Sequence, residues 1–427
     1  MRRPSPASHR SSVERRKSRY HSHVRRALYV LATLSFSCFS PTLPTGKPCA
    51  QPGDQCPPGL DCIDGTCETP GTVKDRDPDV PDCPWRSEHL VPCAFPQSSA
   101  ELLLDSDHVF DTDALTFETF VPDPDVTIST IEIGGVEAAL IVADEIRLTP
   151  SASLRLFGTR PVIFAAYSSI KVEGTVDVSS TTNSRGAGGS PENCATDSVG
   201  LARGGAGGSH STVLGGNGGG TNGGGLGGEA MLPTSELPLQ GGCRGGRGGD
   251  GEPSSSGGSG GHGGGAIYLS AQTLIEISGT IAAGGGGGAG AGSGADAGSS
   301  HPGGGGGGAG GHVILESPQI MLLQALIAAN GGGGGGGSAE GNAGSTGGPG
   351  PAGVVGGSPG QGGGAGGDGG RGGDGSGCPG SAAAPGAQTN GGGGGGGACG
   401  KLDIYSDDVD QSTSTFSPGP TTFELPE

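Results

Sequence analysis

The chain has few of the side chains that build a thick hydrophobic core. Aromatic residues make up 4% of its 427 positions, one tryptophan occurs, and hydrophobic residues of all kinds account for 31%. Chains of this length ordinarily form two or three domains, each around a core rich in such residues. The composition therefore argues against a conventional globular enzyme and predicts a thin core.

Basic residues are scarce after the first 26 positions. Nine of the 23 Lys and Arg residues lie in that N-terminal segment, while the whole chain carries a formal charge of −19. An acidic surface repels phosphate backbones, which proteins bind through clustered Lys and Arg. We therefore expect no nucleic-acid partner and no resident cofactor, and the acidity is compatible with weak Ca²⁺ binding.

Motifs for common enzyme chemistry are also missing. No GxxxxGK[ST] sequence occurs, and the GxGxxG matches arise from composition, because none follows a strand and opens a helix. No GxSxG motif leads from a strand into a helix. Three histidines, His210, His262 and His301, lie in glycine-rich loops without a metal-ligand neighbour. We expect these three, and His312 at the start of a strand, to be surface residues.

Residues 1–40 form a predicted targeting segment. The apolar stretch 27–39 follows a basic region and is too short to span a membrane, as in a secretory signal. Arg25 and Arg26 faintly resemble a twin-arginine signal. Cys38 follows the apolar stretch and is a candidate for lipidation, so free secretion and a lipid anchor both stay open. The predicted location is outside the cell or on its outer surface.

Ten further cysteines are candidates for disulfide bonds, because an even number in an exported chain is typical of them. Their pairing stays open. They are Cys49, Cys56, Cys62, Cys67, Cys83, Cys93, Cys194, Cys243, Cys378 and Cys399.

The first six of these cysteines lie in 41–97, a module with almost no apolar residues, which disulfides must therefore hold together. Zinc is the alternative, but the paired CxxC spacings of zinc sites are absent. The run CAQPGDQCPPGLDCIDGTC at 49–67 resembles the small Dickkopf-like cysteine repeats of exported bacterial proteins, which implies no activity. Four acids of the linker that ends the module, Asp75, Asp77, Asp79 and Asp82, lack the glycine and glutamate of an EF-hand loop.

Residues 100–183 alternate apolar and polar positions and are rich in β-branched residues, which predicts strands. Three segments of equal length, 162–176, 267–281 and 313–327, each begin and end with a β-branched residue, and a more polar fourth copy lies at 402–416. Such copies cannot bury an apolar face alone, so they are expected to stack.

Stacking of these copies predicts an all-β fold, a single-stranded β-solenoid or β-helix-like core. Its strands start in 100–183 and continue at 266–281 and 312–327, and 401–427 is expected to be a capping strand and tail that covers the open edge. The predicted inward residues of two copies are Ile163, Ile170, Val172, Val176, Tyr268, Ile275, Ile277 and Ile281.

Glycine dominates 184–400, where all but ten of the 97 glycines lie. These tracts are expected to be long insertions between the copies, and ordinary loops are far shorter. They are either disordered or packed as extended glycine helices of three residues per turn, in the manner of polyglycine II. Glycine recurs at every third residue along much of 341–375, which favours packing. Asp368 and Asp374, within this tract, are expected to be solvated turn residues.

From about 105 to 400 the chain resembles a group of exported glycine-rich proteins of large-genome Gram-negative soil bacteria, loosely labelled PE-PGRS-like. The segments that carry the resemblance are HVFDTDALTF at 108, IVADEIRLTPSASLRLFGTRPVIFAAYSSIKVEGTVDVSS at 141, and the strands flanked by glycine runs. The resemblance implies placement at the cell surface and no catalytic residues.

The predicted function is that of a non-enzymatic surface protein, structural or adhesive, that contacts glycans, matrix or ions through glycine-rich surfaces. A polysaccharide lyase or hydrolase is the alternative, because exported β-helical proteins include such enzymes, but a fold alone does not give a function. That alternative requires carboxylates to converge in a groove, and the repeat copies offer Asp177, Glu173, Glu276 and Glu316.

Overall fold

The computed structural model describes residues 61–63, 66–68, 84–192, 194, 199–220, 238–252, 255–293, 299–353 and 355–426. The chain divides into two units, Met1–Pro81 and Asp82–Glu427. In the first unit, strands β1 (Asp61–Ile63) and β2 (Thr66–Glu68) pair in antiparallel fashion, with Cys62 and Cys67 as register partners. The predicted signal segment and the cysteines at 38, 49, 56 and 83 lie outside the described residues.

The second unit is built on two large sheets. The seven-stranded sheet has the order β19 (Thr415–Ser417), β16 (Leu326–Ala328), β13 (Thr280–Ala282), β10 (Thr175–Asp177), β8 (Ser153–Phe157), β4 (His108–Asp111), β5 (Thr116–Phe117). Its pairs are parallel apart from β4 with β5.

The eleven-stranded sheet has a main path and three further strands. The path is β18 (Asp408–Asp410), β15 (Gln319–Leu322), β12 (Leu274–Ile277), β9 (Val162–Val172), β11 (Ala266–Ala271), β14 (His312–Glu316), β17 (Lys401–Tyr405), β20 (Thr421–Phe423). The strands beside it are β7 (Val136–Leu148), β3 (Glu101–Leu104) and β6 (Thr127–Ile133).

The expected single-stranded solenoid is wrong, although the chain is nearly all β. The strands belong to several sheets, one of them curled and parallel and another mixed, because β6 folds back on β7 as an antiparallel hairpin. The one helical turn described is η1 (Pro92–Ala94). Within the described residues, no helix is long and apolar enough to cross a membrane.

The pairing register follows the sequence copies. Val162 pairs with Ile267, which aligns with Val313 and then with Leu402. At the other end of each copy, Val176, Ile281, Ile327 and Phe416 form a second column of parallel pairs. Every copy thus contributes to both sheets. The first copy supplies the long strand β9 to the eleven-stranded sheet and each later copy supplies two shorter strands, while every copy supplies one strand to the seven-stranded sheet.

Two hydrophobic cores result from the alternation of side chains along the strands. Val162, Ile170 and Val176 face the larger core, which lies between the sheets. Ile163 and Tyr268, predicted to face the same way, instead face a second core under Trp85, Leu90 and Phe95. That prediction was wrong because positions of opposite parity along a strand point to opposite faces, and here both faces are covered.

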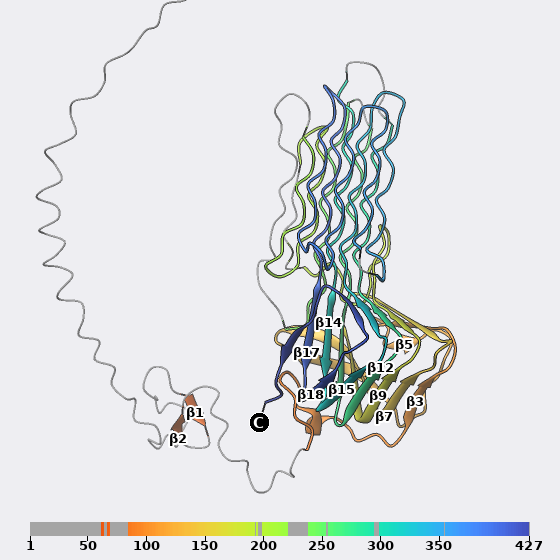
Figure 1. Cartoon of the computed structure of the whole chain (residues 1–427), viewed down its shortest axis with the longest axis vertical. Coiled ribbons are helices and arrows are strands. Elements are labelled where there is room, and N and C mark those ends of the chain that lie inside the picture. The colour runs from red at the N-terminus through yellow and green to blue at the C-terminus, as the bar shows by residue number, and fades with distance from the viewer. Residues whose placement is uncertain are drawn as a thin grey trace, which may run out of the picture. The chain divides into compact units, whose positions relative to one another are not determined.

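The glycine-rich tracts form a bundle that extends from one end of the sheets (Figure 1). We call the described residues of 183–265, 283–311 and 329–400 the glycine bundle. Along 331–338, the amide of every third residue donates to the same neighbouring segment. The three series of acceptors lie within 367–373, 302–308 and 345–348, with N to O distances of 2.8 to 3.1 Å. This period of three is the geometry of an extended glycine helix that bonds to several neighbours.

Glycine is required because the segments approach so closely. A Cβ atom built on Gly334 would lie 1.8 Å from the carbonyl oxygen of Gly394, and one on Gly397 would lie 1.9 Å from that of Gly308. Both distances are far below any van der Waals contact. The interior of the bundle therefore consists largely of backbone, and the side chains enclosed in it, such as those of Ala309 and Ser338, are few.

Two disulfide bonds fasten the bundle. Cys194 is bonded to Cys243 and Cys378 to Cys399, which resolves two of the pairings that the sequence left open. Cys93 is also disulfide-bonded. Disulfides persist in oxidising environments, so these bonds point to an extracellular or secreted protein.

The close approach of the segments predicts a large difference between two glycine substitutions. We expect Gly334→Ala to lower the free energy of unfolding by about 1–3 kcal/mol or more, because the methyl group has to displace a neighbouring backbone. The control is Gly377→Ala, since a Cβ atom there meets nothing within 4 Å. Denaturant unfolding monitored by circular dichroism measures both, and equal stability of the two variants would contradict the packed interior.

Candidate functional site

A pocket of about 260 Å³ lies where the glycine bundle joins the eleven-stranded sheet. His210 comes from the bundle, His312 is the first residue of β14, and Asp403 lies on β17. We call this the histidine pocket. Its remaining lining residues are His89, Ser211, Pro238, Gln240, Lys401 and Tyr405.

The polar contacts of the histidine pocket centre on Asp403. Its Oδ2 accepts hydrogen bonds from His312 Nε2 at 2.9 Å and from Lys401 Nζ at 2.7 Å. Asp403 is 2% exposed and pairs with Ile314, in the column that also contains Tyr268. The fourth copy of the repeat therefore carries a carboxylate at a position that is apolar or aromatic in the other copies.

The charges of this group follow from its contacts. Burial raises the pKa of Asp403, but the hydrogen bonds and charges of His312 and Lys401 outweigh burial and bring the pKa below its ordinary value. Burial lowers the pKa of His312 by more than Asp403 raises it. At neutral pH the group consequently holds an aspartate anion, a lysine cation and a neutral histidine that donates through Nε2.

One atom of the group has unused bonding capacity. Oδ1 of Asp403 is buried and has no hydrogen-bond partner among the described residues. A buried acceptor without a partner costs about 1–3 kcal/mol. A hydroxyl or amide donor inside the pocket would remove that cost, so the histidine pocket is suited to hold a small polar group.

His210 also lines the pocket. It is 4% exposed, its Nε2 donates to the carbonyl oxygen of Gln240 at 3.2 Å, and its ring meets that of His312 edge-on with centroids 5.9 Å apart. Burial, and then the neighbouring His312, lower the pKa of His210 to about 3.

The expectation of surface histidines was therefore wrong. His210, His301 and His312 are all buried, and His262 is partly buried. The reason is that the glycine tracts pack against one another and against the sheets, so their few side chains are enclosed rather than left in solvent.

A second buried polar group holds the segment 84–95 against the sheet. Glu316 is fully buried and accepts hydrogen bonds from the amide of Glu88 at 2.6 Å and from the hydroxyls of Ser87 and Tyr268. Trp85 donates its indole N–H to Ser270 at 3.2 Å. Every contact of Glu316 is internal, so its role is to anchor this segment.

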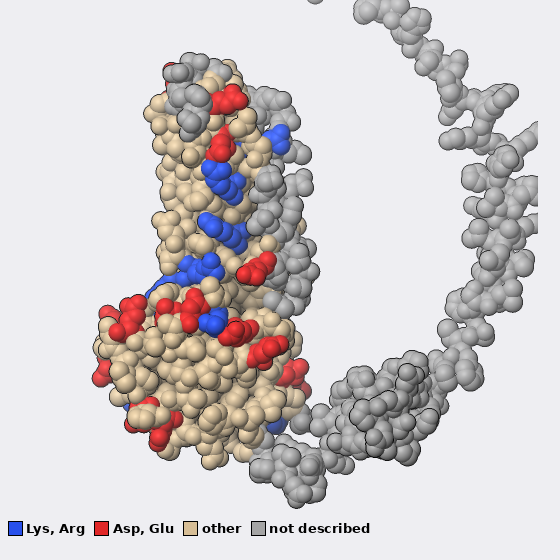
Figure 2. All heavy atoms as spheres, turned by 180° about the vertical axis from the view of Figure 1, so that it is seen from behind, with Lys and Arg blue, Asp and Glu red and all other residues tan. Residues whose placement is uncertain are grey.

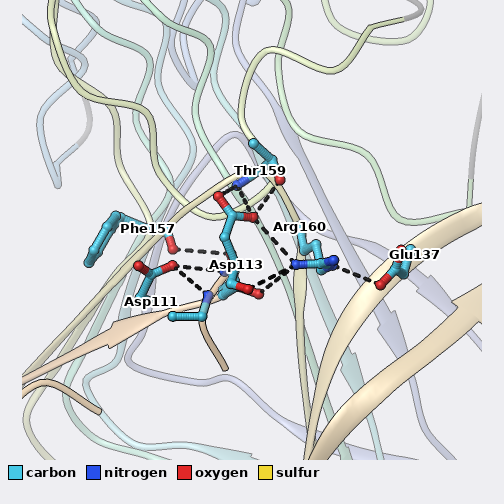
Figure 3. Close-up of polar contacts among 8 residues, drawn as sticks. Asp111, Asp113, Glu137, Phe157, Thr159 and Arg160 are labelled. Atoms are coloured by element: carbon cyan, nitrogen blue, oxygen red, sulfur yellow. Dashed lines mark hydrogen bonds and ion pairs between the residues drawn. The ribbon is translucent and has the colours of Figure 1, made fainter. Parts of the chain in front are cut away.

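Figure 3 shows a third polar group, in the loop after β4. Arg160 lies between two carboxylates, with Nε 2.9 Å from Glu137 Oε1 and Nη1 3.7 Å from Asp113 Oδ1. Asp113 also accepts from the amide of Thr159 at 2.9 Å, and Asp111 accepts from the amide of Asp113 at 2.8 Å. These contacts fix the turn between β8 and β9.

The four carboxylates that the enzymatic alternative would need do not lie at one site. Glu173 and Glu276 lie 3.5 and 3.1 Å from Lys171 Nζ, and Asp177 lies 2.7 Å from Arg155 Nη1. Glu316 faces the second core. The first three are thus paired with cations on the sheet surface, and the fourth is enclosed.

The acids considered for Ca²⁺ also have other roles or lie outside the described residues. Asp374 is 3% exposed and accepts hydrogen bonds from Arg371, Ser376 and the amide of Gly356, so its expected place in solvent was wrong. Asp368 is exposed, as expected. The linker acids at 75, 77, 79 and 82 are not among the described residues. In the part of the chain that is described, no group of His, Cys, Asp or Glu side chains is placed to hold a metal ion.

The buried histidines predict a stability that falls in acid. Burial lowers the pKa of His210 to about 3, and burial together with Arg244 and Arg185 lowers that of His262 to about 4. Below about pH 6.5 the unfolded chain therefore binds protons that the folded chain excludes, and each histidine removes about 1.4 kcal/mol per pH unit. The loss continues until the folded-state pKa is reached.

Denaturant unfolding at pH 8, 6.5 and 5 measures this loss. His210→Gln retains a donor for Gln240 but cannot take up a proton, so its stability should depend less on pH than that of the wild type. An identical pH dependence in the two proteins would contradict a buried neutral His210.

Comparison with protein-family models, curated proteins and solved structures found no match to this chain.

Proposed function

We propose that this is a non-enzymatic exported protein of the outer cell surface, structural or adhesive, that contacts glycans or matrix through its glycine bundle. The observation that carries the proposal is that the interior and the outer faces of the bundle have different roles. Backbone hydrogen bonds with a period of three hold its interior, so most of its long and charged side chains lie on the outer faces. Because folding does not require the side chains on those faces, they are available to contact other molecules.

Two further observations support this function. The disulfide bonds Cys194–Cys243 and Cys378–Cys399 fit a protein exposed to an oxidising environment. The formal charge of −19 favours solubility and discourages self-association outside the cell. A lipid anchor at Cys38, retaining the protein at the membrane surface, is a part of the proposal that concerns residues outside those described.

The enzymatic alternative is less well supported. A glycoside hydrolase ordinarily needs two carboxyl groups about 5–10 Å apart, one of them to act as a general acid. Glu173 and Glu276 share Lys171 as an ion-pair partner, so both carboxyl groups are engaged by the protein's own side chains. Production of new reducing ends or unsaturated sugars by the purified protein would overturn the non-enzymatic proposal.

A complementation experiment tests the adhesive or structural role. A strain that lacks the gene should lose adhesion to glycan-coated surfaces or envelope integrity, and the wild type and Gly377→Ala should restore it. Gly334→Ala should fail to do so, because it disrupts the bundle and leaves the outer side chains unchanged. Unchanged adhesion and envelope integrity in the strain without the gene would contradict the proposal.

A further inference from the structure

A second pocket, of about 450 Å³, lies on the side of the glycine bundle. It is bordered by Arg185, Arg244 and Arg247, together with His262 and Ser259. We call it the arginine pocket. Figure 2 shows several Lys and Arg side chains along one face of the bundle, with Asp and Glu side chains near its far end and around the sheets.

The period of the glycine helix explains why the arginines share one face. The amides of residues 242, 245 and 248 donate to 258–264, and those of residues 243, 246 and 249 donate to 203–209. The remaining positions, which include Arg244 and Arg247, point outward. Three residues of an extended glycine helix rise by roughly 9 Å, so these two side chains stand in a line about one turn apart.

Two of the arginines have no carboxylate partner. Arg247 is paired with Asp250, but neither Arg185 nor Arg244 forms an ion pair with any described residue. Arg244 donates through Nε to the carbonyl oxygen of Gly260 at 3.1 Å, which fixes its side chain and leaves the terminal nitrogens available. Among the described residues, two guanidinium groups at one pocket thus have no ion-pair partner, although acidic residues outnumber basic ones 42 to 23 in the chain.

The pKa of His262 indicates that the charges of Arg244 and Arg185 act on the same side chain. Burial, then Arg244 and then Arg185, lower the pKa of His262 to about 4. Its Nδ1 lies 3.3 Å from the hydroxyl of Ser190, and that hydroxyl accepts from the amide of Gly263 at 3.0 Å. Both arginines therefore direct positive potential at a neutral ring within the pocket.

We propose that the arginine pocket binds the carboxylate or sulfate groups of an acidic polysaccharide. Guanidinium groups match both anions with paired hydrogen bonds, which are stronger than neutral ones. The Ser259 hydroxyl, which forms no hydrogen bond with the described residues, and the surrounding glycine backbone offer contacts to sugar hydroxyls. Glu192, an exposed acid at the pocket, disfavours ligands with dense negative charge.

A continuous phosphate backbone is a poorer fit than a polysaccharide. Nucleic acid binds through many clustered basic residues, and the rest of this surface is acidic. A glycan with separated charges can place one anionic group between the arginines and keep the others away from the acidic sheets. This inference rests on the proposed glycan-contact function and names the class of glycan.

Titration calorimetry of the purified full chain with polygalacturonate, dextran sulfate and neutral dextran tests the inference. We expect binding to at least one polyanion that weakens with added salt, and none to dextran. Arg185→Gln and Arg244→Gln should each weaken it about tenfold, the loss typical of one charge-assisted hydrogen bond. Preference for polygalacturonate supports a carboxylate ligand, and preference for dextran sulfate supports a sulfate ligand.

Arg147→Gln is the matched control, because it removes the same charge from the sheet region and leaves Glu173 beside Lys171. Its affinity should equal that of the wild type, and unfolding midpoints should show that all variants are folded. No binding to either polyanion, or full binding by the Arg185→Gln/Arg244→Gln double variant, would overturn the inference. If that double variant still restored adhesion in the strain without the gene, the pocket would be ruled out while the adhesive function remained.

Discussion

The hydrogen bond between two glycine backbones in direct contact is the interaction on which the rest of this structure depends. In an ordinary domain, side chains separate the backbones and burial of apolar surface stabilises the fold. In the glycine bundle a Cβ atom would lie about 2 Å from a neighbouring carbonyl oxygen at position after position, so no side chain separates the segments. Because glycine loses more backbone entropy on folding than any other residue, each segment must form hydrogen bonds to several neighbours at once.

The two sheets explain how such segments come together. The bundle leaves the seven-stranded sheet after β10, β13 and β16, which are neighbours, and returns at β11, β14 and β17, which are neighbours in the other sheet. Strand neighbours lie about 4.8 Å apart, so the chains enter the bundle at that spacing. The amides of Ala283, Gly311 and Gly400 continue the ladder by bonding to Ala328, Ala283 and Ala329. Only segments without side chains can keep this spacing to neighbours on several sides at once, which accounts for the glycine composition.

Much of the sheet register could be predicted from the sequence, because apolar residues recur at equal intervals. The alignment of 162–176 with 267–281 and 313–327 coincides with the parallel pairs of β9, β11 and β14 and the strands that follow them. The same pattern could not show that the prediction of a single-stranded solenoid is wrong. The antiparallel β6 and the segment 84–95 that covers the second core lie outside the repeated residues, and alternation alone does not tell which face of a strand is covered.

The histidine pocket was missed for a related reason. His312 was expected to be a surface residue at the start of a strand, and its partner Asp403 lies 91 residues away in the sequence. A usable signal existed, since the fourth copy has Asp403 where the others have Ile163, Tyr268 and Ile314. A charged residue at an otherwise buried position of a repeat requires a partner, and that requirement points to the neighbouring strand. The partners of individual glycines offer no such signal, because identical residues carry no information on register.

The same lack of side chains determines where recognition can be located. Within a glycine helix most inward positions are occupied by glycine, and an outward residue recurs once per turn. Arg244 and Arg247 occupy outward positions. Their substitution alters the surface and, at Arg244, removes one bond to the carbonyl of Gly260, but it leaves the backbone hydrogen bonds of the bundle in place. In a globular domain, replacing a charged surface residue can also disturb the packing of its apolar stem on the surface beneath. In the function proposed above, folding depends on the backbone and binding on the outward residues, so the two properties can vary independently.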